Sequence, residues 1–266
     1  MSTPERYTHG YTESVLTSHS RRTVENSFAY GRHLLRPGLT VLDLGCGPGT
    51  ISVDLASRVA PGQVVAVDID AGVLARAQEK ASGVSNLWFV QAGAYQLAFP
   101  DATFDLSHAH QVLQHLSDPV AALRELARVT RPGGTVAVRD ADYGALSWYP
   151  ELPGLEKWRV LYRTVARANG GEPDAGRHLL SWAHTAGLGQ VEVHTSTWTF
   201  SAGDGAAWWG RSWARRVEDP AFADQAVSLG LASASDVTEL SEAWLAWADD
   251  PDAIFVVPHT ELLITC

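Results

Sequence analysis

The 266-residue sequence predicts an α/β fold, with a doubly wound, mostly parallel sheet of seven strands, helices on both faces and an antiparallel last strand. Between residues 40 and 140, short β-branched runs alternate with helical patterns, as in βαβ units. The first run leads directly into a glycine-rich turn and a helix. After residue 140, long stretches lack a strand pattern, which indicates helical insertions beside the sheet.

Strands are expected where β-branched and aromatic residues cluster between turn-forming residues. They are Thr40–Leu44, Gln63–Ile69, Leu87–Gln91, Phe104–His110, Thr135–Arg139, Val191–Trp198 and Ile254–Thr265. Helices are expected where apolar residues recur at helical spacing, before turns such as Pro61–Gly62. They are Tyr11–Leu35, Thr50–Val59, Ala71–Ala81, Pro119–Val129, Trp148–Ala168, Asp174–Ala186, Ala206–Arg216, Ala221–Leu229 and Asp236–Ala248.

The length of the chain fits one domain over residues 1–266. Residues 36–145 would form its core, cofactor-binding half. Segments 11–35, 146–172 and 203–249 would form a helical cap over the substrate site. The sequence leaves a homodimer open.

The charge of the chain argues against a nucleic-acid partner. Thirty acidic and 20 basic residues give a formal net charge of −10, which repels polyanions. The basic runs, Arg21–Arg22 and Arg215–Arg216, are short. A small-molecule substrate is therefore expected.

Cysteine usage and hydropathy indicate the compartment. The two cysteines, Cys46 and Cys266, form neither a disulfide framework nor a zinc-binding spacing. Residues 1–11 are polar, and no apolar run is long enough to span a bilayer. We expect a cytoplasmic protein without a membrane partner.

The glycine-rich turn is the main candidate binding element. Gly45, Gly47 and Gly49 alternate with other residues, so the backbone can approach a ligand closely. Dinucleotide binders use the longer G-x-G-x-x-G spacing and place a pyrophosphate there. The shorter spacing, with Asp43 just before it, favours a ligand that carries an ammonium group, such as S-adenosylmethionine. Backbone N–H groups at the helix start suit its carboxylate, and Asp43 suits its amino group.

A second acidic position indicates a nucleoside. Asp68 ends the second expected strand, nineteen residues after Gly49, where a carboxylate can accept bonds from both ribose hydroxyls. Asp70 is assigned to cap the helix that follows. Nicotinamide cofactors need the same ribose contact, so Asp68 alone does not identify the nucleoside.

Four segments together resemble class I S-adenosylmethionine-dependent methyltransferases, of the quinone-biosynthesis-like small-molecule branch. They read V-L-D-L-G-C-G-P-G-T, V-V-A-V-D, F-D-L-S-H-A-H-Q-V-L-Q-H-L-S-D-P and R-P-G-G-T-V, within residues 40–140. The resemblance implies that Gly45 and Gly47 approach the methionine portion, that Asp68 holds the ribose and that Ile69 packs on the adenine. It places His110 and Gln111 beside the methionine and the reactive methyl group.

One position departs from that family pattern. Where the family has G-D-A after the third strand, this sequence has Ala92-Gly93-Ala94, so the acid expected to bind the adenine is missing. We assign this contact to the Ala94 backbone with Tyr95 or Gln96. Cys46 is expected among the cofactor-binding residues, as a small residue packed in the turn and not as a nucleophile. Tyr11 is expected to reach the cofactor from the N-terminal helix.

Methyl transfer from a sulfonium mainly requires alignment of the reactants and exclusion of water. A base would help a hydroxyl or carbon acceptor, and His110, Asp140 and His19 are the candidates. No metal is expected, because neither cysteine nor acid completes a ligand set around His108 and His115.

Nine of the ten tryptophans follow residue 140, in or beside the expected cap. Their rings offer rigid surface to a flat or apolar acceptor, although a packed helical cap would also use them. The expected substrate-lining residues are Tyr143, Trp148, Trp208 and Trp209.

The sequence leaves several classes of function open. The leading hypothesis is methyl transfer to a small, apolar or aromatic organic molecule, for instance in specialised metabolism. A protein that binds S-adenosylmethionine but catalyses another reaction would carry the same motifs. The glycine spacing disfavours a nicotinamide-dependent dehydrogenase, and the charge disfavours methylation of RNA or protein.

Overall fold

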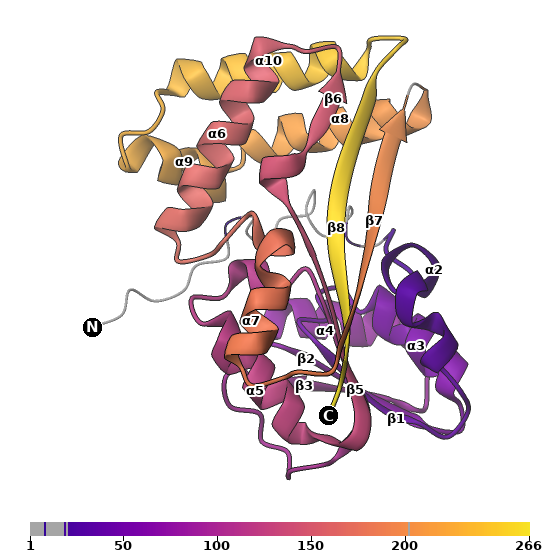
Figure 1. Cartoon of the computed structure of the whole chain (residues 1–266). Helices are drawn as coiled ribbons and strands as arrows, with labels where there is room; N and C mark the ends of the chain where they lie inside the picture. Colours follow the sequence, from indigo (N-terminus) through magenta and orange to yellow (C-terminus); the bar gives the residue numbers. More distant parts are fainter. Residues whose placement is uncertain (1–7, 9–18, 20, 202) are drawn as a thin grey trace.

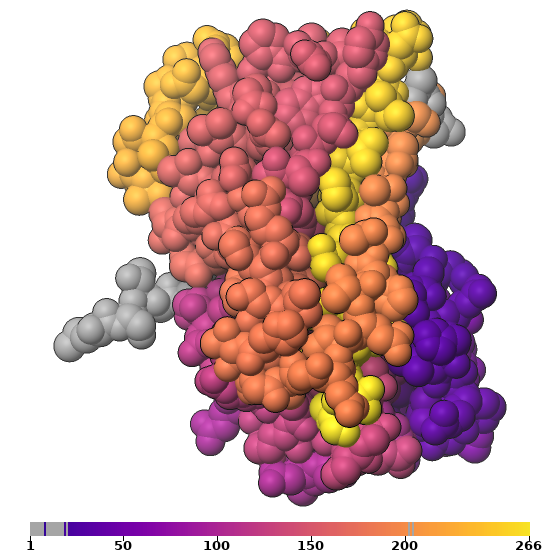
Figure 2. Space-filling view, viewed as in Figure 1, coloured from indigo at the N-terminus to yellow at the C-terminus, as the bar shows by residue number. Residues whose placement is uncertain are grey.

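The computed structural model describes residues 8, 19, 21–201 and 203–266. An α/β lower part and a helical upper part are connected by two long neighbouring strands, β7 (Val191–Ser201) and β8 (Ile254–Thr265) (Figure 1). Figure 2 shows the same two strands side by side on one face of the molecule. Tyr11, one of the expected cofactor contacts, lies outside the described residues.

The strands form one sheet in the order β3-β2-β1-β4-β5-β8-β6, with β7 also paired to β8. Strands β1 to β5 are parallel, and β8 runs antiparallel to β5, β6 and β7. The predicted mostly parallel sheet with an antiparallel last strand is therefore confirmed. The remaining strands are β1 (Thr40–Leu44), β2 (Gln63–Asp68), β3 (Leu87–Gln91), β4 (Phe104–His110), β5 (Thr130–Ala141) and β6 (Ser147–Tyr149).

Helices cover both faces of the sheet, because each face presents apolar side chains. Those of α2, α3 and α4 share one buried cluster with the sheet, and those of α5 and α7 share another. The helices here are α2 (Val24–Ser27), α3 (Thr50–Val59), α4 (Ala71–Lys80), α5 (Pro119–Val129) and α7 (Leu179–Thr185). Four short 3₁₀ segments connect them: η1 (Ala29–Leu34), η2 (Leu113–His115), η3 (Tyr143–Ala145) and η4 (Ala175–His178).

The upper part has its own aromatic core. It is built from α6 (Pro153–Ala168), α8 (Asp204–Val217), α9 (Pro220–Ser228) and α10 (Ala234–Ala248), packed on the upper end of β8. Gly210 allows α8 to approach α10, because a Cβ there would lie 2.6 Å from the Cβ of Ala248. We call this buried aromatic group the cap cluster; it centres on Trp158, Trp213, Trp244 and Phe255.

Several expected elements differ in their bounds, and for two of them packing or chain geometry gives the cause. The described part of the expected helix Tyr11–Leu35 consists of the short α2 and η1, because Phe28 has φ −135° and leaves the helical conformation. Its ring is buried 4.8 Å from that of His108, so packing on the core ends α2.

The second difference adds an eighth strand. Residues 147–149 form β6 and pair with β8, although a helix was expected to begin at Trp148. Pro150 disfavours helical backbone at the residue before it, Tyr149, and α6 begins only at Pro153. None of the described helices combines the length and the apolar character needed to cross a membrane.

The cap cluster should carry much of the stability of the upper part. Trp244 is fully buried, whereas Trp88 is 56% exposed on β3. We expect Trp244→Ala to lower the free energy of unfolding by about 3–5 kcal/mol, because it leaves a cavity among rings. The matched Trp88→Ala variant should lose about 0.5 kcal/mol or less. Urea denaturation followed by circular dichroism measures both, and equal losses would contradict the assignment.

Candidate functional site

A cavity of about 1140 Å³ lies between the sheet and the cap. On one side it is lined by the loops that follow β1, β2, β3 and β4, the edge at which open parallel sheets bind ligands. On the other side it is lined by aromatic residues of η3, α6, α8, β7 and β8. Residues 11–18 lie outside the described chain, so this lining refers to the described residues only.

The glycine-rich turn opens onto this cavity. Gly45, Gly47 and Gly49 have φ of 67°, 53° and 75°, a left-handed conformation that favours glycine. A Cβ on Gly45 would lie 2.4 Å from Cγ2 of Val112, so this position cannot carry a side chain without rearrangement. A Cβ on Gly47 would meet only Nδ1 of His19, at 4.0 Å. The turn therefore presents open backbone to a ligand.

Asp68 is the last residue of β2 and lines the same cavity. Its Oδ2 accepts a hydrogen bond from the Gly47 N–H at 2.9 Å, and its Oδ1 accepts one from the Asp70 N–H at 3.1 Å. Burial raises the pKa of this carboxyl, while these bonds lower it. Ile69, although apolar, is 63% exposed and lines the cavity beside Asp68, so it offers an uncovered surface to a flat ring. Asp70 caps α4 by accepting from the Val73 N–H.

Asp43 lines the cavity, but both of its oxygens already accept hydrogen bonds from the protein. Nδ1 of His108 lies 2.8 Å from Oδ1, and the Ser52 hydroxyl donates to Oδ2 at 2.5 Å. Each carboxylate oxygen can accept a second hydrogen bond, so contact of Asp43 with the amino group of the cofactor, directly or through water, stays a prediction. Cys46 also lines the cavity, and burial raises the pKa of its thiol far above the ordinary value.

The loop after β3 brings Gly93, Ala94 and Tyr95 to the cavity. The Tyr95 hydroxyl accepts hydrogen bonds from the backbone N–H groups of Ser117 and Asp118, at 3.1 and 3.2 Å. This side chain therefore ties the β3 loop to the start of α5. The ring of Tyr95 and the backbone of Ala94 remain beside Ile69 as candidates for the adenine side.

His110 and Gln111 lie at the end of β4. Among the described residues, neither buried ring nitrogen of His110 has a hydrogen-bond partner. Burial lowers the pKa of His110 well below the usual range, helped by the charges of Arg22 and Arg139. His110 is thus a neutral imidazole at pH 7. Gln111 has a φ of 54°, and its amide accepts from Nη2 of Arg22 at 2.5 Å and contacts Nε2 of His259 at 2.9 Å.

Of the three expected bases, His110 and His19 line the cavity and Asp140 does not. His19 lines the cavity beside Gly47. Asp140 is fully buried and does not line it; its Oδ1 accepts from the Gln114 N–H at 3.1 Å, and burial raises its pKa to about 8. We correct its assignment from a candidate base to a residue that fixes the loop carrying Gln114.

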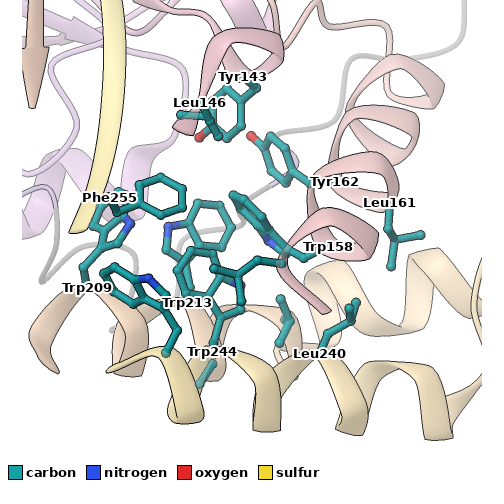
Figure 3. Close-up of a cluster of buried hydrophobic side chains, with 14 of the residues drawn as sticks. Tyr143, Leu146, Trp158, Leu161, Tyr162, Trp209, Trp213, Leu240, Trp244 and Phe255 are labelled. Atoms are coloured by element: carbon teal, nitrogen blue, oxygen red, sulfur yellow. The ribbon is translucent and has the colours of Figure 1, made fainter. Parts of the chain in front are cut away.

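Among the expected substrate-lining residues, Tyr143, Trp208 and Trp209 line the cavity. Trp148 does not; its ring stacks on Phe255 at 5.6 Å and carries the guanidinium of Arg159 on its face, so it packs behind the lining. The turn into β6 places it there. Figure 3 shows Tyr143, Trp158, Trp209, Trp213 and Phe255 converging on one another from four elements.

Sequence reasoning missed three arginines that line the cavity, namely Arg21, Arg22 and Arg216. Arg21 lies 4.4 Å above the ring of Trp208, and Arg22 lies 5.6 Å from that of Trp198. They come from the two basic runs of the sequence. Those runs were visible, but only the fold shows that they meet at one cavity.

Comparison with known proteins establishes the class. The family model described as "Methyltransferase domain" matches residues 42–138. An uncharacterized methyltransferase of Schizosaccharomyces pombe is 33% identical over 276 residues, which covers 97% of this chain and 95% of the relative. The chain belongs to the methyltransferase family, and its methyl donor is S-adenosylmethionine, as the sequence predicts.

Other relatives agree at lower coverage. A ubiquinone/menaquinone biosynthesis C-methyltransferase of Xanthomonas axonopodis is 36% identical over 133 residues, which covers 48% of this chain and 53% of that protein. The crystal structure of the YcgJ protein from Bacillus subtilis has a TM-score of 0.59 at 21% identity, covering 91% of this chain and 98% of that one. The latter likeness shows the shared fold.

Asp68 gives a direct test of the cofactor side. We expect Asp68→Ala to weaken binding of S-adenosylhomocysteine about a hundredfold, because hydrogen bonds to a charged group contribute about 1.5–3 kcal/mol each. Asp101→Ala, on an exposed loop away from the cavity, should bind normally. Isothermal titration calorimetry measures both constants. Unchanged binding by Asp68→Ala would remove Asp68 from the site.

Asp140 should make stability depend on pH. Its folded pKa of about 8 lies above the ordinary value of 3.8 for an aspartate, so its contribution to stability is present at low pH and is lost as pH rises through about 8. Asp140→Asn cannot ionise, so its stability relative to wild type should be greater at about pH 9 than at about pH 4. Urea denaturation at both values tests this, with exposed Asp224→Asn as control. A difference independent of pH would contradict it.

Proposed function

We propose that this methyltransferase acts on a small, flat and largely apolar organic molecule, which binds in the aromatic half of the cavity. One observation carries the proposal: a single cavity extends from the glycine-rich turn to the cap cluster. Ligand pockets commonly enclose about 300–1,000 Å³. A volume of about 1140 Å³ therefore has room for a cofactor and an acceptor together.

The residues of the sheet side fit S-adenosylmethionine. The open backbone at Gly47 and the helix start behind it suit the methionine end. Asp68 is placed for the ribose hydroxyls, and the exposed side chain of Ile69 for the adenine. His110 would lie between this part and the aromatic half, since it lines the cavity at the end of β4.

The residues of the cap side fit a flat acceptor. Tyr143, Trp158, Trp209, Trp213 and Phe255 present rings from η3, α6, α8 and β8. Aromatic rings supply large rigid surface at low entropy cost, and these are already held by mutual packing, such as the 4.5 Å contact of Trp158 with Trp213. A preorganised aromatic wall of this kind favours an acceptor that is flat and largely apolar.

Bound S-adenosylmethionine supplies a methyl group on a sulfonium: an acceptor lone pair bonds to the carbon while the carbon–sulfur bond breaks and leaves its electron pair on sulfur. The protein aligns the reactants and excludes water. For a hydroxyl acceptor, His110 is our candidate to take the proton, because its ring is neutral and its nitrogens bond to no other residue in the described part of the chain. His19 is the second candidate, since it lines the cavity beside Gly47.

The function is tested by incubating the protein with S-adenosylmethionine and flat hydroxylated probes, dihydroxynaphthalenes and hydroxyflavones, with detection by mass spectrometry. We expect a product that is heavier by one methylene unit, together with S-adenosylhomocysteine. A probe that changes without gaining this mass would favour a cofactor-binding protein with another chemistry. If S-adenosylmethionine binds but no probe is methylated, the proposed acceptor class is wrong.

His110 can be tested with an acceptor found in that screen. His110→Phe keeps a ring of similar size and should lower kcat about a hundredfold, the usual range for loss of a general base. Its affinity for S-adenosylhomocysteine should change little. His178→Phe, whose ring stacks on Trp182 outside the cavity, is the matched control. If both variants retain full kcat, His110 is not the base.

A further inference from the structure

Resting on the proposed function, we further infer that the acceptor is an anion: a flat aromatic molecule bearing a carboxylate or phenolate, which Arg216 recognises from the cap side. The inference concerns which molecules bind in the aromatic half. It comes from the two short basic runs of the sequence, which the fold brings to one cavity.

The charges around the cavity are divided between its two sides. Among the described lining residues, the carboxylates are Asp43, Asp68 and Asp70, which lie near the ends of β1 and β2 or directly after β2. The arginines Arg21, Arg22 and Arg216 contact rings of α8 and β7, namely Trp208, Trp198 and Trp213, and Arg22 also donates to Gln111 after β4. The acidic side suits a cofactor with an ammonium group and ribose hydroxyls, and the basic side suits an anion.

Arg216 is the arginine best placed to read charge. It lies on α8 and is only 7% exposed, with its guanidinium carbon 5.0 Å from the ring centre of Trp213. Burial raises the pKa of Tyr143, while the positive charges of Arg216 and Arg22 lower it, so both charges act on the same cavity wall. Charges in such a poorly solvated place interact more strongly than they would in water.

The net charge of the protein makes this local arrangement necessary for an anionic ligand. At −10 overall, the molecule repels anions at long range. The arginines that line the cavity place positive charge beside the aromatic half, and a planar guanidinium can donate two parallel hydrogen bonds to a carboxylate or one to a phenolate oxygen. A cationic acceptor would meet these arginines and, in addition, the sulfonium of the cofactor. The aromatic half therefore selects against amines.

The test uses three naphthalene probes that differ in charge: 2-naphthoate, neutral 2-naphthalenemethanol and cationic 2-naphthylmethylammonium. Each is titrated by calorimetry into wild-type protein saturated with S-adenosylhomocysteine. We expect naphthoate to bind about tenfold more tightly than the alcohol and the ammonium to bind most weakly. Equal or tighter binding of the ammonium, or no binding of naphthoate, overturns the inference.

The basic run itself provides a matched pair of variants. Arg216→Gln should weaken naphthoate binding about tenfold and leave the neutral alcohol unchanged. Arg215→Gln removes the same charge from the adjacent, exposed position, which does not line the cavity, and should have no effect. Equal effects of the two variants on naphthoate would show that only overall charge matters and would overturn the role of Arg216.

Two further measurements separate the ways in which the inference can fail. Retained binding of S-adenosylhomocysteine by Arg216→Gln shows that this variant is folded; if it does not fold, Arg216→Lys, which keeps the charge, should still prefer naphthoate to the alcohol. Loss of that preference in Arg216→Lys, with the fold intact, would contradict recognition of the anion by the positive charge at this position and would overturn the inference. Failure of the wild type to bind the cofactor would instead refute the proposed function.

Discussion

Strand β8 is the element on which both halves of the molecule depend. Its residues Ile254–Val256 pair with β6, residues His259–Thr265 pair with β5, and β7 pairs along its whole length. It therefore reaches from the parallel sheet into the cap, where Phe255 is buried among tryptophans. Because this strand is hydrogen-bonded on both edges, it fixes the distance between the glycine-rich turn and the aromatic wall. The cavity is the space left between them.

Buried polar contacts connect β8 to the ends of the neighbouring strands. Glu261 accepts from Nε of Arg139 at 2.8 Å and from the Ser196 hydroxyl at 2.5 Å, which joins β8 to β5 and β7. The carboxylate raises the pKa of Arg139, which burial alone lowers. Such a pair adds little net stability, but loss of one partner would leave a charge buried without compensation, at a cost of about 3–5 kcal/mol. The pair therefore specifies how the three strands align.

Local sequence patterns predicted the elements of the cofactor half well. The positions of β1 to β4, α3 and α5 follow from β-branched runs and from capping residues such as Asp118 before Pro119. Errors occurred where packing overrides local preference. Phe28 ends α2 because its ring is buried, and Trp148 lies in β6 because this segment pairs with β8, more than a hundred residues away. Periodicity carries no information on such contacts.

The cap illustrates the same limit for the site. The abundance of tryptophan predicted an aromatic surface, but not which rings face the cavity. Trp148 was expected to line it and instead packs on Phe255, whereas Trp158 and Trp213, from two different helices, line it. The orientation of each ring depends on the crossing of α6, α8 and α10, which close contacts such as that at Gly210 determine.

The sequence by itself determined the α/β class, the glycine-rich turn and the residues that suit S-adenosylmethionine, because these depend on neighbours within a short stretch of chain. Only the tertiary structure decided which residues share the cavity. Arg22 and Arg216 both line the cavity, although almost two hundred residues separate them in the sequence. Asp140 is fully buried and does not line the cavity. The physical reason is that burial and charge environment are set by contacts between distant segments, chiefly those that the long strand β8 brings together.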